Sequence, residues 1–165
     1  MGTPLVDLHA VFASKHDHGH SWNSERFGHH PVDCLEIFSG HSKISGAFAD
    51  RRRGVLQPRD LIFGHDLHKE CERDAVFKDL YHYTPRMVWL APPCTVWCGF
   101  SRLNFNSQER RRRRRREQDL IRLVEEVIVF QRAHQGLVVV ENPRTSDIWN
   151  HSTLRRWYND PEMHR

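Results

Sequence analysis

Short apolar runs alternate with longer amphipathic stretches from residue 32 onward. Four apolar runs predict strands, at residues 32–38 (VDCLEIF), 61–64 (LIFG), 86–91 (RMVWLA) and 136–143 (GLVVVENP). Helical spacing predicts helices at residues 43–53, 69–83, 108–135 and 152–160, with a loop at 99–107. The longest helix is expected to bury one stripe, formed by Leu120, Ile121, Val124, Val127, Ile128 and Gln131.

This alternation of strands and helices predicts an α/β fold. Strands that are apolar on both faces indicate a parallel sheet with helices on both faces. We place this domain at residues 32–158, after a poorly ordered lead-in (1–31, with a short helix near Leu5–Phe12) and before a tail (159–165). In such sheets ligands bind beyond the carboxyl ends of the strands, so the residues that follow each strand are the candidates for chemistry.

Positive charge is concentrated in one segment. The chain has a net charge of +4, and removing the seven consecutive arginines Arg110–Arg116 leaves −3 for the rest. A cluster of this kind can neutralise several phosphates and bind nucleic acid in a salt-dependent, sequence-independent way. The alternative is a solvated helical face or a nuclear-import signal. Because cations at the start of a helix oppose its dipole, we expect this turn to be poorly ordered without a polyanion.

Composition excludes several classes. No apolar run approaches the length of about 18 residues that a membrane span needs, so we expect no membrane partner. The N-terminus lacks a secretory signal, so the four cysteines are expected to be reduced, in a nuclear or cytoplasmic protein. The cysteines and histidines lack the spacing of a zinc site, so we expect no metal site; the histidines at 16–20 bind metal at most adventitiously.

The stretch EIFSGHS (36–42) ends the first predicted strand and opens a helix. Gly40 lets the backbone approach a nucleotide-like ligand closely, and Glu36 and Phe38 can contact its polar and flat parts. The alternative is an ordinary strand–helix turn that needs one glycine. Asp66, after the next predicted strand, can accept hydrogen bonds from a ribose, or cap the following helix.

Two further stretches follow predicted strands. Cys94 comes directly after Pro92 and Pro93, which restrict the backbone that presents it, and a thiolate is a strong nucleophile. The alternatives are a buried structural thiol or a redox pair with Cys98. Glu141 ends a very apolar strand, where a desolvated carboxylate can hold or donate a proton. Asn142 can add amide contacts; otherwise Glu141 caps a turn or pairs with an arginine such as Arg144.

These stretches, in this order, resemble the cytosine-C5 DNA methyltransferases over roughly residues 32–150. EIFSG is similar to that family's Asp-Leu-Phe-x-Gly cofactor loop, PPCTVWC to its Pro-Cys loop and ENP to its Glu-Asn-Val motif. Retroelement and phage relatives also show PPC and ENP variants, which suggests a retroelement or phage-like polyprotein as the source. The resemblance implies a Rossmann-like fold and S-adenosylmethionine as the cofactor, held by Glu36, Phe38, Ser39, Gly40, Asp66 and Pro92.

The resemblance also implies a catalytic set, Cys94, Glu141 and Asn142, and DNA as the partner, with RNA as the alternative. Cys94 would attack C6 of a flipped-out cytosine while Glu141 holds the base at N3 and its exocyclic amine. The family's later motifs have no counterpart after ENP. We therefore expect a truncated methyltransferase-like domain, either active or inactivated by the truncation, which is a fragment, a degenerate copy or one piece of a larger polyprotein. The alternative is a non-catalytic nucleic-acid-binding or scaffold domain that uses Arg110–Arg116.

Overall fold

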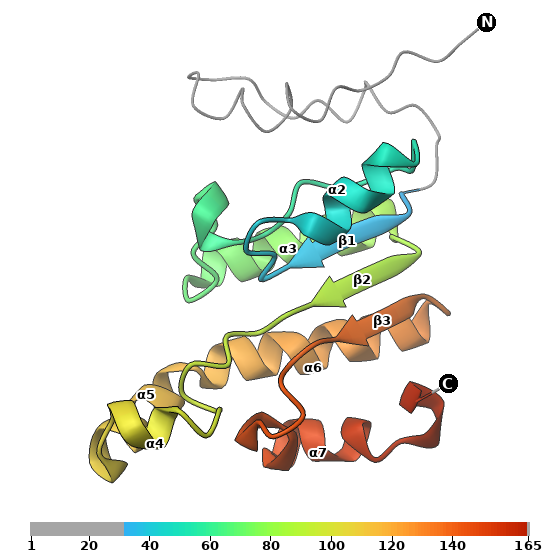
Figure 1. Cartoon of the computed structure of the whole chain (residues 1–165). Coiled ribbons are helices and arrows are strands. Elements are labelled where there is room, and N and C mark those ends of the chain that lie inside the picture. Colours follow the sequence, from blue (N-terminus) through green and yellow to red (C-terminus); the bar gives the residue numbers. More distant parts are fainter. Residues whose placement is uncertain (1–31, 165) are drawn as a thin grey trace, which may run out of the picture.

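The computed structural model describes residues 32–164 and has an α/β fold (Figure 1). Three parallel strands form one sheet in the order β1 (Cys34–Ile37), β2 (Met87–Leu90) and β3 (Leu137–Val140). Three of the four predicted strands are therefore confirmed, with shorter bounds. The predicted lead-in at 1–31 lies outside the described residues.

Six α-helices and three short 3-10 helices surround or connect these strands in the described part of the chain. The α-helices are α2 (Lys43–Asp50), α3 (Glu70–Tyr83), α4 (Ser101–Asn104), α5 (Ser107–Arg116), α6 (Gln118–Ala133) and α7 (Ser152–Tyr158). The 3-10 helices are η3 (Leu61–Phe63), η4 (Asp147–Asn150) and η5 (Pro161–His164). The predicted loop at 99–107 thus contains the single turn of α4.

The core lies between the sheet and the two helices α3 and α6, which pack on the same face (Figure 1). Alternation along the strands turns one set of side chains toward these helices, and Leu35, Ile37, Val88 and Leu90 are fully buried there. The whole stripe predicted for the long helix is buried, as are Leu123 and Phe130 beside it.

Among the described residues, a helix covers the opposite face of the sheet over β1. There α2 packs against β1, whereas Leu137 at the start of β3 is 58% exposed. Helix α7 lies beside β3 and packs against α6 (Figure 1). The predicted α/β parallel sheet is thus confirmed, whereas its second face carries less helical cover than expected.

The strand predicted at residues 61–64 is wrong. Residues Leu61–Phe63 form η3, and Leu61 and Ile62 are 70% and 63% exposed. The Asp60 side chain caps this turn by accepting a hydrogen bond from the Ile62 backbone N–H at 2.9 Å. The strand was predicted from the apolar composition of this segment alone, but the Leu61 and Ile62 side chains are not buried against the sheet.

The extended segment lies just before η3, along the free edge of β1. Val55 and Arg59 form isolated parallel bridges with Cys34 and Ile37. Pro58 lies between the two bridges and has no N–H to donate to a ladder. The segment therefore extends the sheet irregularly and leads the chain to Asp60 at the same edge as the end of β1.

The helix predicted at 108–135 is two helices, α5 and α6, which meet at Glu117. Asn106 caps α5, because its side chain accepts a hydrogen bond from the Glu109 N–H at 2.9 Å. Most of the arginine run consequently lies in the second half of α5, and Arg113–Arg116 occupy its last turn. Positive charge at this end of a helix interacts favourably with the helix dipole and stabilises the helix. The expected opposition between arginines and dipole is wrong.

The domain continues past the predicted boundary at residue 158. Helix α7 ends at Tyr158, and η5 follows at Pro161–His164. Met163 is partly buried and packs against the hydrophobic core. These residues, predicted as a tail, are therefore in contact with the domain.

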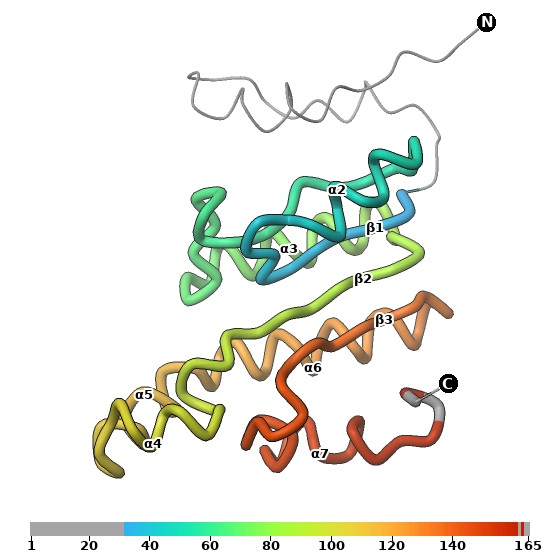
Figure 2. The backbone as a smooth tube through the Cα atoms, viewed as in Figure 1, coloured from blue at the N-terminus to red at the C-terminus, as the bar shows by residue number. Residues whose placement is uncertain are grey.

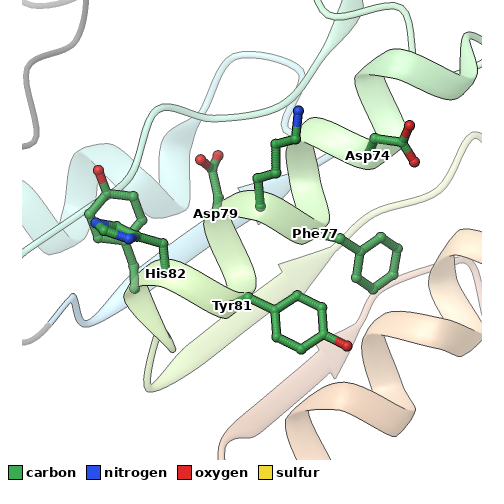
Figure 3. A pocket seen from close by; sticks show the side chains of 7 residues that line it. Asp74, Phe77, Asp79, Tyr81 and His82 are labelled. Atoms are coloured by element: carbon green, nitrogen blue, oxygen red, sulfur yellow. The ribbon is translucent and has the colours of Figure 1, made fainter.

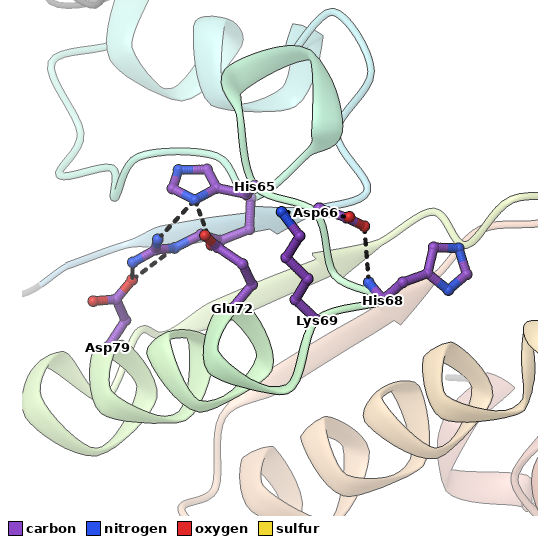
Figure 4. A network of polar contacts seen from close by, with 7 residues as sticks. His65, Asp66, His68, Lys69, Glu72 and Asp79 are labelled. Carbon is purple, nitrogen blue, oxygen red and sulfur yellow. Dashed lines mark hydrogen bonds and ion pairs between the residues drawn. The ribbon is translucent and has the colours of Figure 1, made fainter.

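A polar cluster fastens the segment after β1 to α3 (Figure 4). The Arg59 guanidinium pairs with Asp79, and its Nη1 lies 3.2 Å from His65 Nδ1. The same His65 nitrogen lies 2.8 Å from Glu72 Oε2. The cluster holds the chain that carries Asp60 against the helix that covers the sheet.

Replacing Asp79 with alanine is expected to destabilise the fold by about 2 kcal/mol. A fully buried ion pair that loses one partner costs about 3–5 kcal/mol, and the Arg59 and Asp79 side chains are 13% and 21% exposed. The free energy of urea unfolding measures the effect. Asp119→Ala is the control, because Asp119 and Arg122 are exposed and 3.7 Å apart, so its cost should stay below about 1 kcal/mol. Equal losses in the two variants would contradict this account of the cluster.

Candidate catalytic edge of the sheet

The loop after β1 turns sharply through left-handed backbone conformations. Phe38, Gly40 and Ser42 have φ angles of 58°, 51° and 52°. Such angles strain non-glycine residues, and strain of this kind is concentrated at functional sites. A Cβ added to Gly40 would meet no atom within 4 Å. The loop therefore leaves open space beside the Gly40 backbone.

Two residues predicted to hold a cofactor, Glu36 and Phe38, are buried and make contacts within the fold. Phe38 is 9% exposed and belongs to the hydrophobic core. Glu36 is 3% exposed, and its Oε2 accepts hydrogen bonds of 2.8 Å from both the N–H and the hydroxyl of Ser45. Glu36 thus ties β1 to the first turn of α2. Ser39 and Gly40 remain half-buried at the loop surface.

The carboxylate beside this loop is that of Asp60. The Gly40 N–H donates to Asp60 Oδ2 at 3.0 Å, so the residue after the extended segment holds the glycine turn. Asp66 instead accepts a hydrogen bond from the His68 N–H at 3.2 Å, and its carboxylate lies 3.9 Å from the Lys69 ammonium (Figure 4). Asp66 therefore supports the turn that leads into α3. Sequence reasoning missed Asp60 because it placed the strand after Asp60 and not before it.

Cys94 opens a helical turn directly after β2 and the two prolines. The N–H groups of Trp97 and Cys98 both donate to the Cys94 carbonyl at 2.9 Å. Val96 and Trp97 are buried and anchor the turn in the core, while Cys94 and Cys98 are only half-buried. Pro92, two residues before Cys94 in the chain, is buried. The turn thus presents the Cys94 thiol at the surface of the sheet edge on a well-anchored backbone.

The environment of Cys94 favours its neutral thiol. Burial raises the pKa of Cys94, and the neighbouring Cys98 and the Glu141 carboxylate add to the rise. A nucleophilic thiolate therefore requires a cation or a bound ligand to form at neutral pH. Cys34 is unsuited to such a role, because burial raises its pKa to about 12.

The geometry disfavours a disulfide between Cys94 and Cys98. In a helical turn the Cβ atoms of residues four apart are about 5–6 Å from each other. A disulfide requires about 3.5–4.5 Å between them. All four cysteines are free thiols in the structure.

The chain leaves β2 and β3 at the same end of the sheet (Figure 2), and two hydrogen bonds join the loops that follow. The Glu141 N–H donates to the Leu90 carbonyl at 2.7 Å, and the Asn142 side-chain amide donates to the Pro92 carbonyl at 2.7 Å. The Oδ1 atom of Asn142 is buried and accepts no hydrogen bond within the described residues. Glu141 itself is exposed, so the expected desolvation of its carboxylate is wrong.

The seven arginines of the run have different environments. Arg112 and Arg113 bind Glu109 at 2.8 Å and hold the pKa of its carboxyl at about 2. Arg114 binds the Val96 carbonyl and the Asp147 carboxylate. The other four arginines have no side-chain partner within residues 32–164. Arg110 is half-buried, whereas Arg111, Arg115 and Arg116 are exposed. We call Arg111, Arg115 and Arg116 the outer arginines.

Three surface hollows lie away from these loops. One is formed by residues of α3 alone, and Figure 3 shows Asp74, Phe77, Asp79, Tyr81 and His82 around it. The second lies between α3 and α6, and the third between β3 and α7. None of the three is lined by Gly40, Cys94 or Glu141, so the candidate site is defined by the loops at the sheet edge.

Comparisons with known proteins assign no family: no family model, curated protein or solved structure matches the chain. Within residues 32–164 no cluster of three or more His, Cys, Asp or Glu side chains is arranged to hold a metal ion. In the same part of the chain, no helix is both long and apolar enough to cross a membrane. The class that the geometry defines is an α/β protein with a three-stranded parallel sheet, which is consistent with a Rossmann-like fold.

Proposed function

We propose that this chain is a cytosine-C5 DNA methyltransferase-like domain that binds S-adenosylmethionine and uses Cys94 as its nucleophile. The observation that carries the proposal is the junction of two loops at the carboxyl edge of the sheet. There Asn142 binds the carbonyl of Pro92 at 2.7 Å, and the charge of Glu141 acts on the Cys94 thiol. A thiol and a carboxylate on neighbouring loops are the pair that attack on a cytosine ring requires.

The residues around Gly40 fit a cofactor of this kind. The space beside the Gly40 backbone is open, and Asp60 holds the turn through the Gly40 N–H. Ser39 and Gly40 would approach the cofactor through their backbone, and Asp60 would receive its ribose hydroxyls. When bound, the cofactor supplies the methyl group. The carboxylate proposed to bind the ribose is therefore that of Asp60, in place of Asp66.

Cys94 and Glu141 would divide the work on the base. The Cys94 thiolate forms a bond to C6 of an extruded cytosine, which raises the electron density at C5. Glu141, when protonated, donates a hydrogen bond to N3, and its second oxygen accepts one from the exocyclic amine. Asn142 keeps the two loops in register through its bond to Pro92. Because the pKa of Cys94 is raised, we expect the free protein to hold it as a neutral thiol.

Binding of S-adenosylmethionine tests the first half of this proposal. Titration calorimetry is expected to give a binding heat with wild-type protein. Gly40→Val should remove it, because the added side chain fills the open space and strains a backbone at a φ of 51°. Gly46→Ala is the control, since Gly46 also has no atom within 4 Å of an added Cβ but lies in α2 with an ordinary φ angle. Absence of heat with the wild type, or equal loss in both variants, would contradict the assignment of this loop.

A second candidate function is nucleic-acid binding without catalysis. It is favoured by the outer arginines, which have no protein partner in the described part of the chain and are free to bind phosphates. The partner would be DNA, with RNA as the alternative, and other segments of a larger polyprotein could share the complex. A nuclear or cytoplasmic location suits both functions. Salt-sensitive binding to DNA without any cofactor heat would favour this second function.

A further inference from the structure

We infer that Arg114 is a positioning residue for Cys94 and does not belong to the phosphate-binding arginines around it. The inference rests on the proposed role of Cys94 as nucleophile. It starts from the environment of Arg114, whose side chain is 25% exposed, whereas Arg111, Arg115 and Arg116 are all exposed. At about 100° per residue, Arg114 lies about 100° around the helix from Arg115 and about 160° from Arg116, so its side chain leaves α5 in a different direction from theirs.

Arg114 binds the Cys94 turn at two points. Its Nε donates a hydrogen bond of 2.9 Å to the Val96 carbonyl. Its guanidinium carbon lies 4.7 Å from the centre of the Trp97 ring, which is the geometry of a cation–π contact. Val96 and Trp97 are the two residues that anchor the turn in the core. Arg114 therefore binds the backbone and the ring that determine where the turn presents Cys94.

Asp147 closes this arrangement into a ring of contacts. Arg114 donates to Asp147 Oδ2 at 2.5 Å, and the Asp147 N–H donates to the Trp97 carbonyl at 2.7 Å. Asp147 begins η4, which follows the loop of Glu141 and Asn142. The ring thus joins α5, the Cys94 turn and the segment after β3. A planar guanidinium can make all three contacts at once, which an ammonium group cannot.

Loss of Arg114 should therefore loosen the Cys94 turn. The Val96 carbonyl loses its charged donor, and the Trp97 ring loses its cation–π contact. Asp147 loses its closer cation and keeps Arg102 at 3.9 Å. The hydrogen bonds from the Trp97 and Cys98 N–H groups to the Cys94 carbonyl are then expected to open more often. Cys94 becomes more exposed, and the burial that raises its pKa is reduced.

The experiment compares Arg114→Met with Arg114→Lys and with Arg115→Met as the matched control. Hydrogen exchange of the Trp97 and Cys98 amides should be about tenfold faster in Arg114→Met than in wild type or Arg115→Met. Arg114→Lys keeps the positive charge but loses the planar guanidinium, so its amide exchange rates should lie between those of Arg114→Met and wild type. This variant provides the test if Arg114→Met does not fold. Alkylation of Cys94 by iodoacetamide should accelerate in Arg114→Met and shift to lower pH.

Two readouts separate positioning from general loss of structure and from phosphate binding. Cys34 is fully buried, so its alkylation reports global unfolding and should stay slow in every variant. The salt dependence of DNA binding should fall in Arg115→Met by about one unit of slope and stay unchanged in Arg114→Met. Amide exchange and Cys94 alkylation in Arg114→Met that equal those of Arg115→Met would overturn the inference. Failure to bind S-adenosylmethionine would instead overturn the proposed function and leave the amide-exchange result standing.

Discussion

Replacing Arg111, Arg115 and Arg116 with glutamine lowers the affinity of the chain for a DNA duplex about a hundredfold at 0.2 M salt. Each phosphate contact contributes about 0.9 to the slope of log affinity against log salt, so three contacts contribute about 2.7. If the binding curves of wild type and variant meet near 1 M salt, this slope corresponds to a difference on the order of 10² at 0.2 M. Fluorescence anisotropy with a labelled duplex, repeated over a salt series, measures both quantities.

The partners of each arginine decide which of them to replace. Arg112 and Arg113 already bind Glu109, and Arg114 holds the Cys94 turn. A variant of the whole run would therefore perturb α5 and the candidate catalytic loop together. The outer arginines have no such contacts, so their replacement tests phosphate binding alone.

The chain offers a control with the same change in charge. Arg51, Arg52 and Arg53 are three consecutive exposed arginines at the end of α2. Their replacement by glutamine should change the salt slope far less than replacement of the outer arginines. Equal effects of the two triple variants would show that binding depends on net charge, and would contradict a phosphate-binding face on α5.

The sequence pattern predicts the helices and strands whose own apolar face is buried in the core. The buried stripe of α6 and the strands β1, β2 and β3 follow from local spacing, because each has an apolar face that must be covered. The pattern failed at residues 61–64, where Leu61 and Ile62 are apolar yet exposed. It also failed before them, where the pairing of Val55 and Arg59 with β1 depends on tertiary contact and leaves no periodic signal.

At the candidate site too, features set by local sequence could be predicted, whereas features set by tertiary contacts could not. The order of the three motifs along the chain, each after an apolar strand, is local information and was visible in the sequence. The engagement of Glu36 by Ser45 and of Gly40 by Asp60 depends on residues 9 and 20 positions away. The division of the arginine run likewise depends on Val96 and Asp147, which no spacing rule within the run could indicate.

Replacing Cys94 with serine should abolish covalent capture of a modified substrate. In a duplex with 5-fluorocytosine at the target base, attack at C6 and transfer of the methyl group to C5 leave fluorine where a proton would otherwise depart. Elimination is then blocked, and the bond between the protein sulfur and C6 persists. A serine hydroxyl lacks the nucleophilicity of a thiolate, so the adduct should fall below detection.

Cys98→Ser is the matched control for this variant. Cys98 lies on the same turn and is also half-buried, and its Sγ lies 3.8 Å from the Thr95 carbonyl. It should retain the adduct, because Cys94 is the thiol that lies directly after the prolines and whose pKa the Glu141 charge raises. Loss of the adduct in Cys98→Ser with its retention in Cys94→Ser would exchange the roles of the two thiols.

The most direct test of the central claim is therefore one gel assay. The wild-type chain, S-adenosylmethionine and a duplex containing 5-fluorocytosine are incubated, denatured and separated by electrophoresis. The account predicts a DNA-linked band for wild type and for Cys98→Ser that requires the cofactor and is absent for Cys94→Ser. A wild-type chain that binds the duplex but forms no such band, or a band that persists in Cys94→Ser, would contradict the account.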